Sequence, residues 1–319
     1  MVVVWGGYVI FKKQTPGGPI KIGVIAPLTG IVADYGEEIK RGVEAGKDEG
    51  VEIVYEDDKC EPKDAVSAFQ KLVEFEKVKF IIGPGCGSPQ EAIVPLLKDK
   101  DVIVLVPSAA SRSLYEQSGG KFYNIQYALE DESKFIAEKM LELGHKKVVL
   151  ISYQNAFSKT HEDSFKKHYK GEIVKHTSFA LDTSDVSTEL AKIKGLEYDA
   201  VFSTDITFFF ANGLEKLRQF GIKVPVFSQY AVELPAVRQL VEGVIYSFPA
   251  DVTEGEGAIF GLSKASAAFL IPLIKECDGE YACVKDKIER SGEFDETGVK
   301  VRSLTLKQIK DGQPVSYNP

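Results

Sequence analysis

Residues 20–30 read Ile-Lys-Ile-Gly-Val-Ile-Ala-Pro-Leu-Thr-Gly, an apolar run of strand length that ends in a turn of small and hydroxyl residues. The pattern after this turn predicts an amphipathic helix over 34–49 and a second strand over 51–56. Two strands joined through a helix are typical of a parallel sheet with helices on its faces. Residues 20–56 alone therefore predict an α/β fold.

The same alternation continues almost to the end of the chain. Further strands are predicted at 78–82, 102–106, 123–127, 147–152, 172–179, 199–203, 224–228, 243–248 and 301–309. Further helices are predicted at 62–75, 89–98, 130–143, 158–169, 185–194, 208–220, 233–241, 258–275 and 281–290. The count gives two sheets of roughly five strands each, so we expect two Rossmann-like, doubly wound lobes.

Composition and missing motifs exclude several classes of protein. The 319 residues carry a formal net charge of −8, which disfavours a nucleic-acid partner. The sequence has no Walker A motif, no GxGxxG and no GxSxG elbow, so we expect neither an enzyme nor a bound cofactor. No CxxC occurs, and His161 and His168 are expected to be solvated on one helix, so no metal site is predicted.

The N-terminal segment 1–19 has a composition of its own. Val2–Phe11 is apolar, and two lysines and a Gly/Pro spacer follow it. Ten helical residues reach about 15 Å, half of a ~30 Å hydrocarbon core. We expect 1–19 to be the tail of an anchor or signal whose beginning is missing, which implies an extracytoplasmic protein that is either anchored to the membrane through this segment or exported with its help. A short strand or a disordered leader is the alternative.

The four cysteines are compatible with an oxidising compartment. Cys60 and Cys86 follow neighbouring predicted strands, at the same edge of a parallel sheet, where they could form a disulfide. Closing this 26-residue separation would stabilise the fold by roughly 3 to 4 kcal/mol. Cys277 and Cys283 flank a polar loop and could form a second, local bridge. Four free thiols are the alternative reading.

The turns that follow the strands differ between the two halves. Ala26–Gly30, Gly83–Ser88 and Pro107–Ser111 are rich in small and hydroxyl residues, which lets a carboxylate approach backbone N–H groups at helix N-termini. The alternative is that these residues only make tight turns. Turns of the second half carry aromatic residues and Asp205, which could receive an ammonium. Of Phe208–Phe210, one or two at most can face a cleft, and Phe209 is the candidate; ordinary helix packing is the alternative.

The chain resembles the periplasmic leucine/isoleucine/valine-binding protein family over about 20–317. The resemblance rests on the run 20–30, Tyr35-Gly36, Gly42, 56–63, 82–86 and 107–110. It implies the type 1 periplasmic-binding fold, with two lobes joined by three crossovers and a disulfide between Cys60 and Cys86. It also implies capture of an amino acid or related small carboxylate by hinge closure, and delivery to the membrane permease of an ABC transporter.

Lobe 1 is then expected to comprise 20–126 and 248–295, and lobe 2 to comprise 127–247 and 296–319. The alternative function is a ligand-sensing receptor ectodomain or regulator with the same fold, which binds a small aromatic or amide-type solute.

The resemblance also implies ligand contacts from both lobes. In the first lobe they fall on Tyr35, Gly87, Ser88, Ser108, Ala109 and Ala110. Gly87 and Ala110 stand where the family has hydroxyl residues. In the second lobe, Phe157 stands for a tyrosine, and Tyr230 stands where the family has the acid that pairs with the ligand's ammonium. Because a buried ammonium needs a counter-charge, Asp205 is the predicted substitute.

Overall fold

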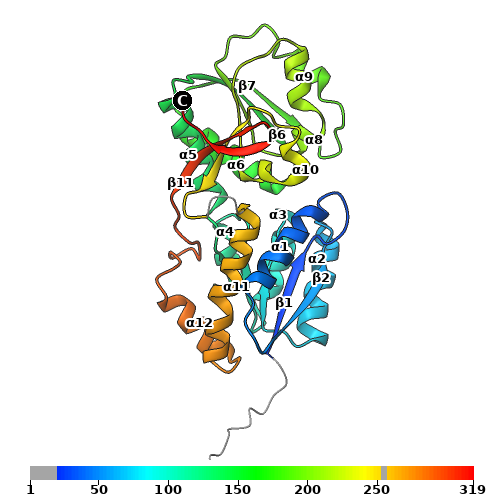
Figure 1. The fold of residues 1–319 in the computed structure, drawn as a ribbon, viewed down its shortest axis with the longest axis vertical. Helices are drawn as coiled ribbons and strands as arrows, with labels where there is room; N and C mark the ends of the chain where they lie inside the picture. The colour runs from blue at the N-terminus through cyan, green and yellow to red at the C-terminus, as the bar shows by residue number, and fades with distance from the viewer. Residues whose placement is uncertain (1–19, 253–256) are drawn as a thin grey trace, which may run out of the picture.

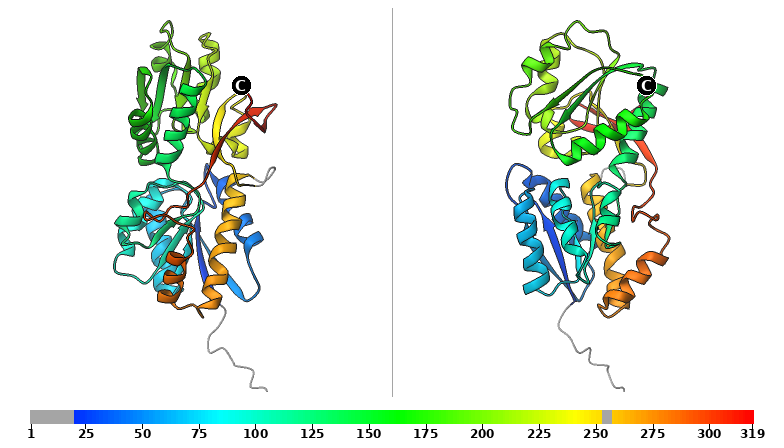
Figure 2. Two further views of the ribbon diagram at one scale, coloured as in Figure 1. Left: turned by 90° about the vertical axis from the view of Figure 1, so that its left-hand side faces the viewer. Right: turned by 180° about the vertical axis from the view of Figure 1, so that it is seen from behind.

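The computed structural model describes residues 20–252 and 257–319 and divides them between two lobes, each built on one sheet (Figure 1). Turned views show the lobes stacked end to end along the long axis (Figure 2). The segment 1–19, predicted to be an anchor or signal, lies outside the described residues.

Lobe 1 contains a five-stranded parallel sheet in the order β2-β1-β3-β4-β5. Its strands are β1 (Ile20–Ala26), β2 (Val51–Asp57), β3 (Phe80–Ile82), β4 (Ile103–Val106) and β5 (Phe122–Asn124). Its helices are α1 (Ala33–Gly46), α2 (Pro62–Gln70), η1 (Lys71–Phe75), α3 (Gly87–Ile93), η2 (Val94–Leu97), α4 (Ser113–Gln117), α11 (Ala258–Glu276) and α12 (Tyr281–Arg290). The inner strand β1 is buried on both faces from Ile22 onward, as helix layers on both sides require.

Lobe 2 contains a seven-stranded sheet in the order β12-β11-β10-β9-β8-β6-β7. Its strands are β6 (Lys147–Tyr153), β7 (Glu172–Phe179), β8 (Ala200–Ser203), β9 (Val226–Ser228), β10 (Ile245–Pro249), β11 (Leu304–Lys310) and β12 (Gln313–Ser316). Its helices are α5 (Leu129–Glu142), α6 (Ala156–His168), α7 (Ser187–Ala191), α8 (Thr207–Phe210), α9 (Gly213–Gln219), η3 (Tyr230–Glu233) and α10 (Pro235–Arg238).

The two sheets repeat one topology. The parallel part of lobe 2, β7-β6-β8-β9-β10, has the same order as β2-β1-β3-β4-β5, and an antiparallel hairpin of β11 and β12 is added at its edge. This order is that of a doubly wound sheet, in which ligands bind beyond the carboxyl ends of the strands. The predicted α/β fold with two doubly wound lobes is confirmed.

Close packing of α1 on α11 holds the helical layer of lobe 1 together. A Cβ at Gly42 would lie 2.4 Å from the carbonyl oxygen of Phe260, so only glycine lets the two helices approach this closely. Among the described residues, α11 is long and apolar enough to span a bilayer, but half of it is buried within the protein. It is therefore well explained as a core helix.

Three segments cross between the lobes and bond to one another. They connect β5 to α5, β10 to α11, and α12 to β11. Asn124, at the end of β5, pairs with Val299 of the third crossover, and the Arg302 side chain of the third donates to the Ile125 carbonyl of the first at 2.7 Å. The Ala250 N–H of the second crossover donates to the Ser303 carbonyl at 2.9 Å. The crossovers therefore form one hydrogen-bonded hinge.

Both predicted disulfides, Cys60–Cys86 and Cys277–Cys283, are present. The helix predicted over 208–220 is broken, because Asn212 adopts a left-handed φ of 54° between α8 and α9. The helix predicted over 233–241 is reduced to short turns, because Pro235 follows Leu234 in an extended conformation. The hairpin strand β12 is an additional element that the sequence pattern did not predict.

Candidate functional site

The turns at the carboxyl ends of the two sheets meet between the lobes. Tyr230, directly after β9, hydrogen-bonds through its phenol to Tyr35 of α1 and to the backbone of Ala109, after β4. Phe157, in the first turn of α6, packs against Gly87 at the start of α3, where an added Cβ would lie 3.3 Å from the Phe157 Cβ. The structure therefore brings five of the predicted site residues together across the lobe interface.

Tyr35 is the most tightly held residue of the lobe 1 wall. Its hydroxyl donates to the Gly85 carbonyl at 2.9 Å, and it also interacts with Ser108 and Tyr230. Burial raises the pKa of Tyr35 to about 12, so the phenol stays protonated at neutral pH. This wall therefore presents neutral hydroxyl groups to the interface.

Three further predicted residues of this wall differ in their burial and bonding: Ser108, Ser88 and Ala110. The buried Ser108 hydroxyl accepts from Gln90 Nε2 at 2.8 Å and keeps its own proton for donation. Ser88 is half-buried in the first turn of α3. Ala110 forms an isolated bridge with Ala128, so its backbone secures the first crossover.

Asp205 and Phe209 are both engaged within lobe 2. One Asp205 carboxylate oxygen accepts from the Thr207 N–H at 2.8 Å and from its hydroxyl at 2.6 Å, and the other accepts from Asn155 Nδ2 at 2.8 Å. Asp205 thus satisfies the start of α8. Phe209 is 1% exposed and packs edge-on against Phe208. Both side chains have local structural partners that account for their positions.

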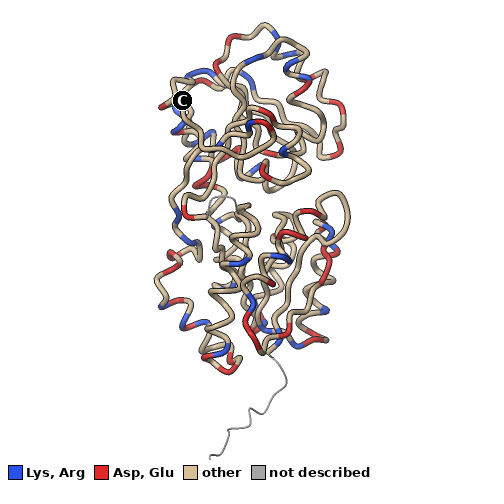
Figure 3. Tube along the Cα trace, in the orientation of Figure 1, with Lys and Arg blue, Asp and Glu red and all other residues tan. Residues whose placement is uncertain are grey.

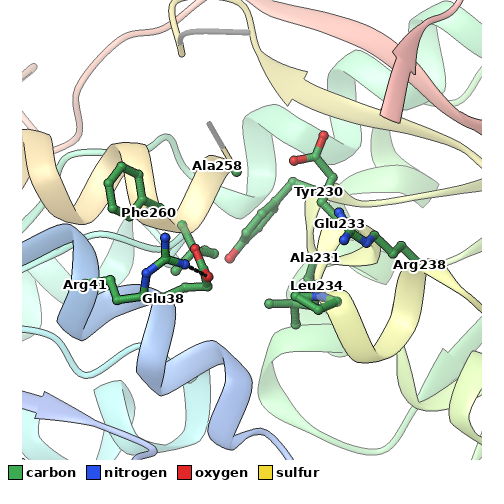
Figure 4. A pocket seen from close by; sticks show the side chains of 12 residues that line it. Glu38, Arg41, Tyr230, Ala231, Glu233, Leu234, Arg238, Ala258 and Phe260 are labelled. Carbon is green, nitrogen blue, oxygen red and sulfur yellow. Dashed lines mark hydrogen bonds and ion pairs between the residues drawn. The ribbon is translucent and has the colours of Figure 1, made fainter. Parts of the chain in front are cut away.

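A cavity of about 350 Å³ opens beside Tyr230, between the lobes (Figure 4). Glu38 and Arg41 of α1 and Phe260 of α11 form its lobe 1 side, with Arg41 ion-paired to Glu38 at 2.5 Å and stacked over Phe260. The Tyr230 ring points into the space from the opposite lobe, above Leu234 (Figure 4). Tyr230 is thus the residue through which the predicted site reaches this cavity.

Glu233 also links the two sides of the cavity. Its carboxylate accepts from the Tyr246 hydroxyl at 2.6 Å, lies 3.5 Å from Lys307 Nζ, and hydrogen-bonds to the backbone of Ala258 at the start of α11. Burial raises the pKa of Glu233 above its ordinary value. Acidic and basic residues are interspersed over both lobes (Figure 3).

Glu132, in the first turn of α5, is a fully buried carboxylate behind Tyr230. Its Oε1 accepts from the Tyr127 hydroxyl at 3.0 Å, from the Tyr230 backbone N–H at 3.1 Å, and from the Ser247 hydroxyl. Its Oε2 has no hydrogen-bond partner among the described residues. Burial raises the pKa of Glu132 to about 7.

His161 faces that free oxygen from α6 and, contrary to the sequence expectation, is fully buried. Its Nδ1 hydrogen-bonds with the Ser133 hydroxyl at 2.6 Å, while its Nε2 lies 3.6 Å from Glu132 Oε2 and has no partner in the described part of the chain. Burial lowers the pKa of His161 to about 3, so the ring is neutral at physiological pH. The Phe157 ring covers it at 4.7 Å between centroids.

The family model of periplasmic binding proteins matches residues 19–252 of the 319. The chain belongs to the periplasmic binding protein family. The family match spans β1 to β10, which contribute the strand-end turns on both sides of the interface.

Relatives and solved structures extend the likeness to almost the whole binding protein. The Leu/Ile/Val-binding protein homolog 3 of Brucella melitensis is 26% identical over 319 aligned positions, covering 93% of this chain and 84% of the relative. A branched-chain amino acid transporter substrate binding protein from Streptococcus pneumoniae, in complex with isoleucine, superposes with a TM-score of 0.81 at 22% identity, covering 93% and 97%. An ABC transporter solute binding protein from R. palustris, in complex with benzoate, gives 0.80 at 21% identity, covering 94% and 95%.

Sequence reasoning missed the charged residues of this binding protein that lie between or behind the lobe walls. Glu38, Arg41 and Glu233 belong to helical segments whose inward faces depend on how the lobes meet. Glu132 and His161 lie in helices rich in Glu and Lys, where a charged side chain is normally solvated. The Glu-Asp-Glu run at 130–132 is itself an ordinary helix N-terminus, so it gave no signal of a buried site.

Proposed function

We propose that this periplasmic binding protein is the extracytoplasmic solute-binding component of an ABC transporter, without a catalytic step of its own. It captures an amino acid or related small carboxylate by closing lobe 1 (20–126 and 248–295) on lobe 2 (127–247 and 296–319) and presents the solute to a membrane permease. We further propose that 1–19 holds it at the membrane or directs its export. The relatives that bind isoleucine or benzoate support this range of ligands.

The contact of Tyr230 with the opposite wall carries the proposal. Its phenol hydrogen-bonds to Tyr35 and to the backbone of Ala109, which belong to lobe 1, while its own backbone is fixed to Glu132 of lobe 2. These bonds exist only when the lobes are shut. A solute that fills the adjoining 350 Å³ cavity adds contacts to the same closed form, and such differential contacts are what shift the equilibrium towards closure.

The carboxylate of the solute has suitable partners on the lobe 1 side. The Ser108 hydroxyl and the Ala109 backbone face Tyr230 and are neutral donors at the end of β4. Donors fixed by a rigid sheet stabilise an anion with little reorganisation. Because Tyr230 already interacts there, we expect the solute to bind beside its phenol and to leave the phenol contacts in place.

Isothermal titration calorimetry with L-isoleucine and with benzoate, combined with small-angle scattering, tests this function. We expect at least one of them to bind with a micromolar or better dissociation constant and to compact the protein. Tyr230→Phe removes the phenol contacts and should weaken binding by about 30-fold, the sum of two ordinary hydrogen bonds of about 1 kcal/mol each. Tyr55→Phe is the matched control, because that hydroxyl donates to Glu44 within lobe 1. No heat with either solute and unchanged scattering would overturn the proposal.

A further inference from the structure

The interlobe cavity is large enough for a small molecule and has apolar walls on both sides. Its volume of about 350 Å³ falls within the roughly 300–1,000 Å³ of small-molecule sites. Leu234 and Pro235 line it from lobe 2, and Ile259 and Phe260 line it from lobe 1. Recognition of a polar solute in this space therefore depends on the few charged groups at its walls.

Four charged residues line the cavity, and three of them already have partners of opposite charge. Arg41 forms an ion pair with Glu38 at 2.5 Å, so these two charges offset each other on the lobe 1 wall. Glu233 accepts a hydrogen bond from the Tyr246 hydroxyl at 2.6 Å and lies 3.5 Å from Lys307 Nζ. The charge of the Glu233 carboxylate is thus matched by groups of lobe 2.

Arg238, at the end of α10, is the fourth charged residue of the cavity. Its guanidinium makes no hydrogen bond or ion pair with any residue in the described part of the chain. The side chain is half-buried, and its guanidinium lies on the lobe 2 wall near Tyr230 and Ala231 (Figure 4). Its five N–H donors are therefore available to a group in the cavity.

The secondary structure does not account for this arginine. A cation at the carboxyl end of a helix commonly stabilises the last carbonyl groups. Arg218 does so at the end of α9, where it donates to the Ile222 carbonyl at 2.8 Å and to the Val224 carbonyl at 3.1 Å. Arg238 follows a helix of only four residues and has no such carbonyl partner. Its place on the cavity wall points instead to a partner in the cavity.

The chemistry of that partner follows from the charge and shape of the guanidinium. A partly buried cation without a counter-charge favours an anion, and its planar fork matches a carboxylate with two parallel hydrogen bonds. The lobe 1 wall beside Tyr230 offers a different kind of partner, the neutral donors of Ser108 and Ala109. A solute with two acidic groups would contact both walls together only when the lobes are shut.

We propose that Arg238 is the anion-binding residue of the lobe 2 wall and pairs with a second acidic group of the captured solute. This rests on the proposed solute-binding function and narrows its substrate class to small dianions, above all dicarboxylates. One carboxylate is held at Ser108 and Ala109 of lobe 1, and the other at Arg238 of lobe 2. Solutes with a single carboxylate lack one of these contacts and are the weaker ligands.

Calorimetry with matched pairs of probes tests this subsite. Terephthalate differs from benzoate, and pentanedioate from butanoate, by one carboxylate, so a rigid and a flexible spacing are both sampled. At least one dianion should bind the wild type about tenfold or more tightly than its matched monoanion. Arg238→Gln should remove this preference and leave the monoanion within about twofold. Arg238→Lys keeps the charge without the fork and should retain part of the preference.

Two controls separate binding from a general effect of charge or folding. Arg290→Gln removes the same charge from α12, where Arg290 pairs with Asp286 and its side chain is 80% exposed, and it should leave the preference unchanged. The wild-type preference should also fall as sodium chloride rises from about 0.05 M to about 0.5 M, because salt screens a partly exposed ion pair. Thermal melts of Arg238→Gln should match the wild type, since no bond within the described residues is lost.

The outcomes distinguish the subsite from the proposed function. A wild type that binds L-isoleucine or a monoanion without preferring either dianion would overturn the subsite, as would a preference that survives Arg238→Gln. In both cases the solute-binding function stands. A wild type that binds neither L-isoleucine nor any of the four acids would overturn the proposed function and the subsite with it.

Discussion

The burial of Glu132 allows a quantitative prediction of how the unfolding free energy depends on pH, without reference to any ligand. The pKa of this carboxyl is raised from 4.5 to about 7 by burial. Between these values the folded protein binds more protons than the unfolded chain, so this group makes the wild type less stable as the pH rises. The shift corresponds to about 3 kcal/mol of unfolding free energy lost between pH 4.5 and pH 7.

Replacing Glu132 by glutamine removes this titration and keeps an acceptor oxygen for the three donors on Oε1. The difference in stability between Glu132→Gln and the wild type should therefore grow by about 3 kcal/mol in favour of the variant from pH 4.5 to pH 7, and stay level above pH 8. His161, whose lowered pKa gives the opposite slope below pH 6.5, is present in both proteins and cancels in the difference. Burial raises the pKa of Tyr127 and Tyr230, so neither contributes in this range.

Urea unfolding followed by far-ultraviolet circular dichroism, at half-unit steps from pH 4.5 to pH 8.5, measures this difference. Glu138→Gln, on the same helix but more than half exposed, provides the baseline and should run parallel to the wild type. Parallel curves for Glu132→Gln as well would mean that Glu132 titrates normally in the folded protein. The burial argument for this carboxylate, and the uncompensated charge behind Tyr230, would then be refuted.

Three further experiments test the scaffold around the site. Replacing Cys60 and Cys86 by serine should lower the unfolding free energy by about 3 kcal/mol, because a 26-residue loop is released, and thermal unfolding with and without reductant measures it. Gly42→Ala should cost about 1–3 kcal/mol by forcing α1 away from α11, whereas Gly257→Ala, where nothing lies within 4 Å, should be nearly neutral in the same melts. Arg112→Ala should cost about 1–2 kcal/mol and loosen the first and third crossovers, detectable as faster amide exchange there, because its guanidinium bonds carboxylates near both.

The alternation of apolar runs and amphipathic helices was sufficient to predict the lobes. Strands such as β1 and β6 carry a continuous apolar run because parallel strands are covered on both faces, and this signal is local in sequence. Helix breaks were harder to predict. The break at Asn212 depends on Gly213, where an added Cβ would lie 2.2 Å from the Phe208 ring, and this contact exists only in the folded protein.

The sequence predicted those site residues that lie in the turns directly after strands, because their chemistry can be read from neighbouring residues. The small residues after β3 and β4 and the aromatic residues after β6 and β9 are visible in the sequence, and the structure places Tyr35, Ala109 and Tyr230 in one interlobe contact. The partners of Glu132, by contrast, include Tyr230 and Ser247, 98 and 115 residues away. A run of acidic residues at a helix start has an ordinary explanation, so nothing local identified the buried member.

Glu132 also connects the lobe interface to the crossover region. Its Oε1 accepts hydrogen bonds from Tyr127 in the first crossover, from Ser247 in the middle of β10, and from Tyr230 at the lobe interface. These bonds fix Tyr230 relative to lobe 2, so its contacts with Tyr35 and Ala109 of lobe 1 report directly on how the lobes meet. Under the proposed function, a solute that touches both lobes gains its full set of contacts only in the closed form, and this difference in contacts would shift the equilibrium towards closure.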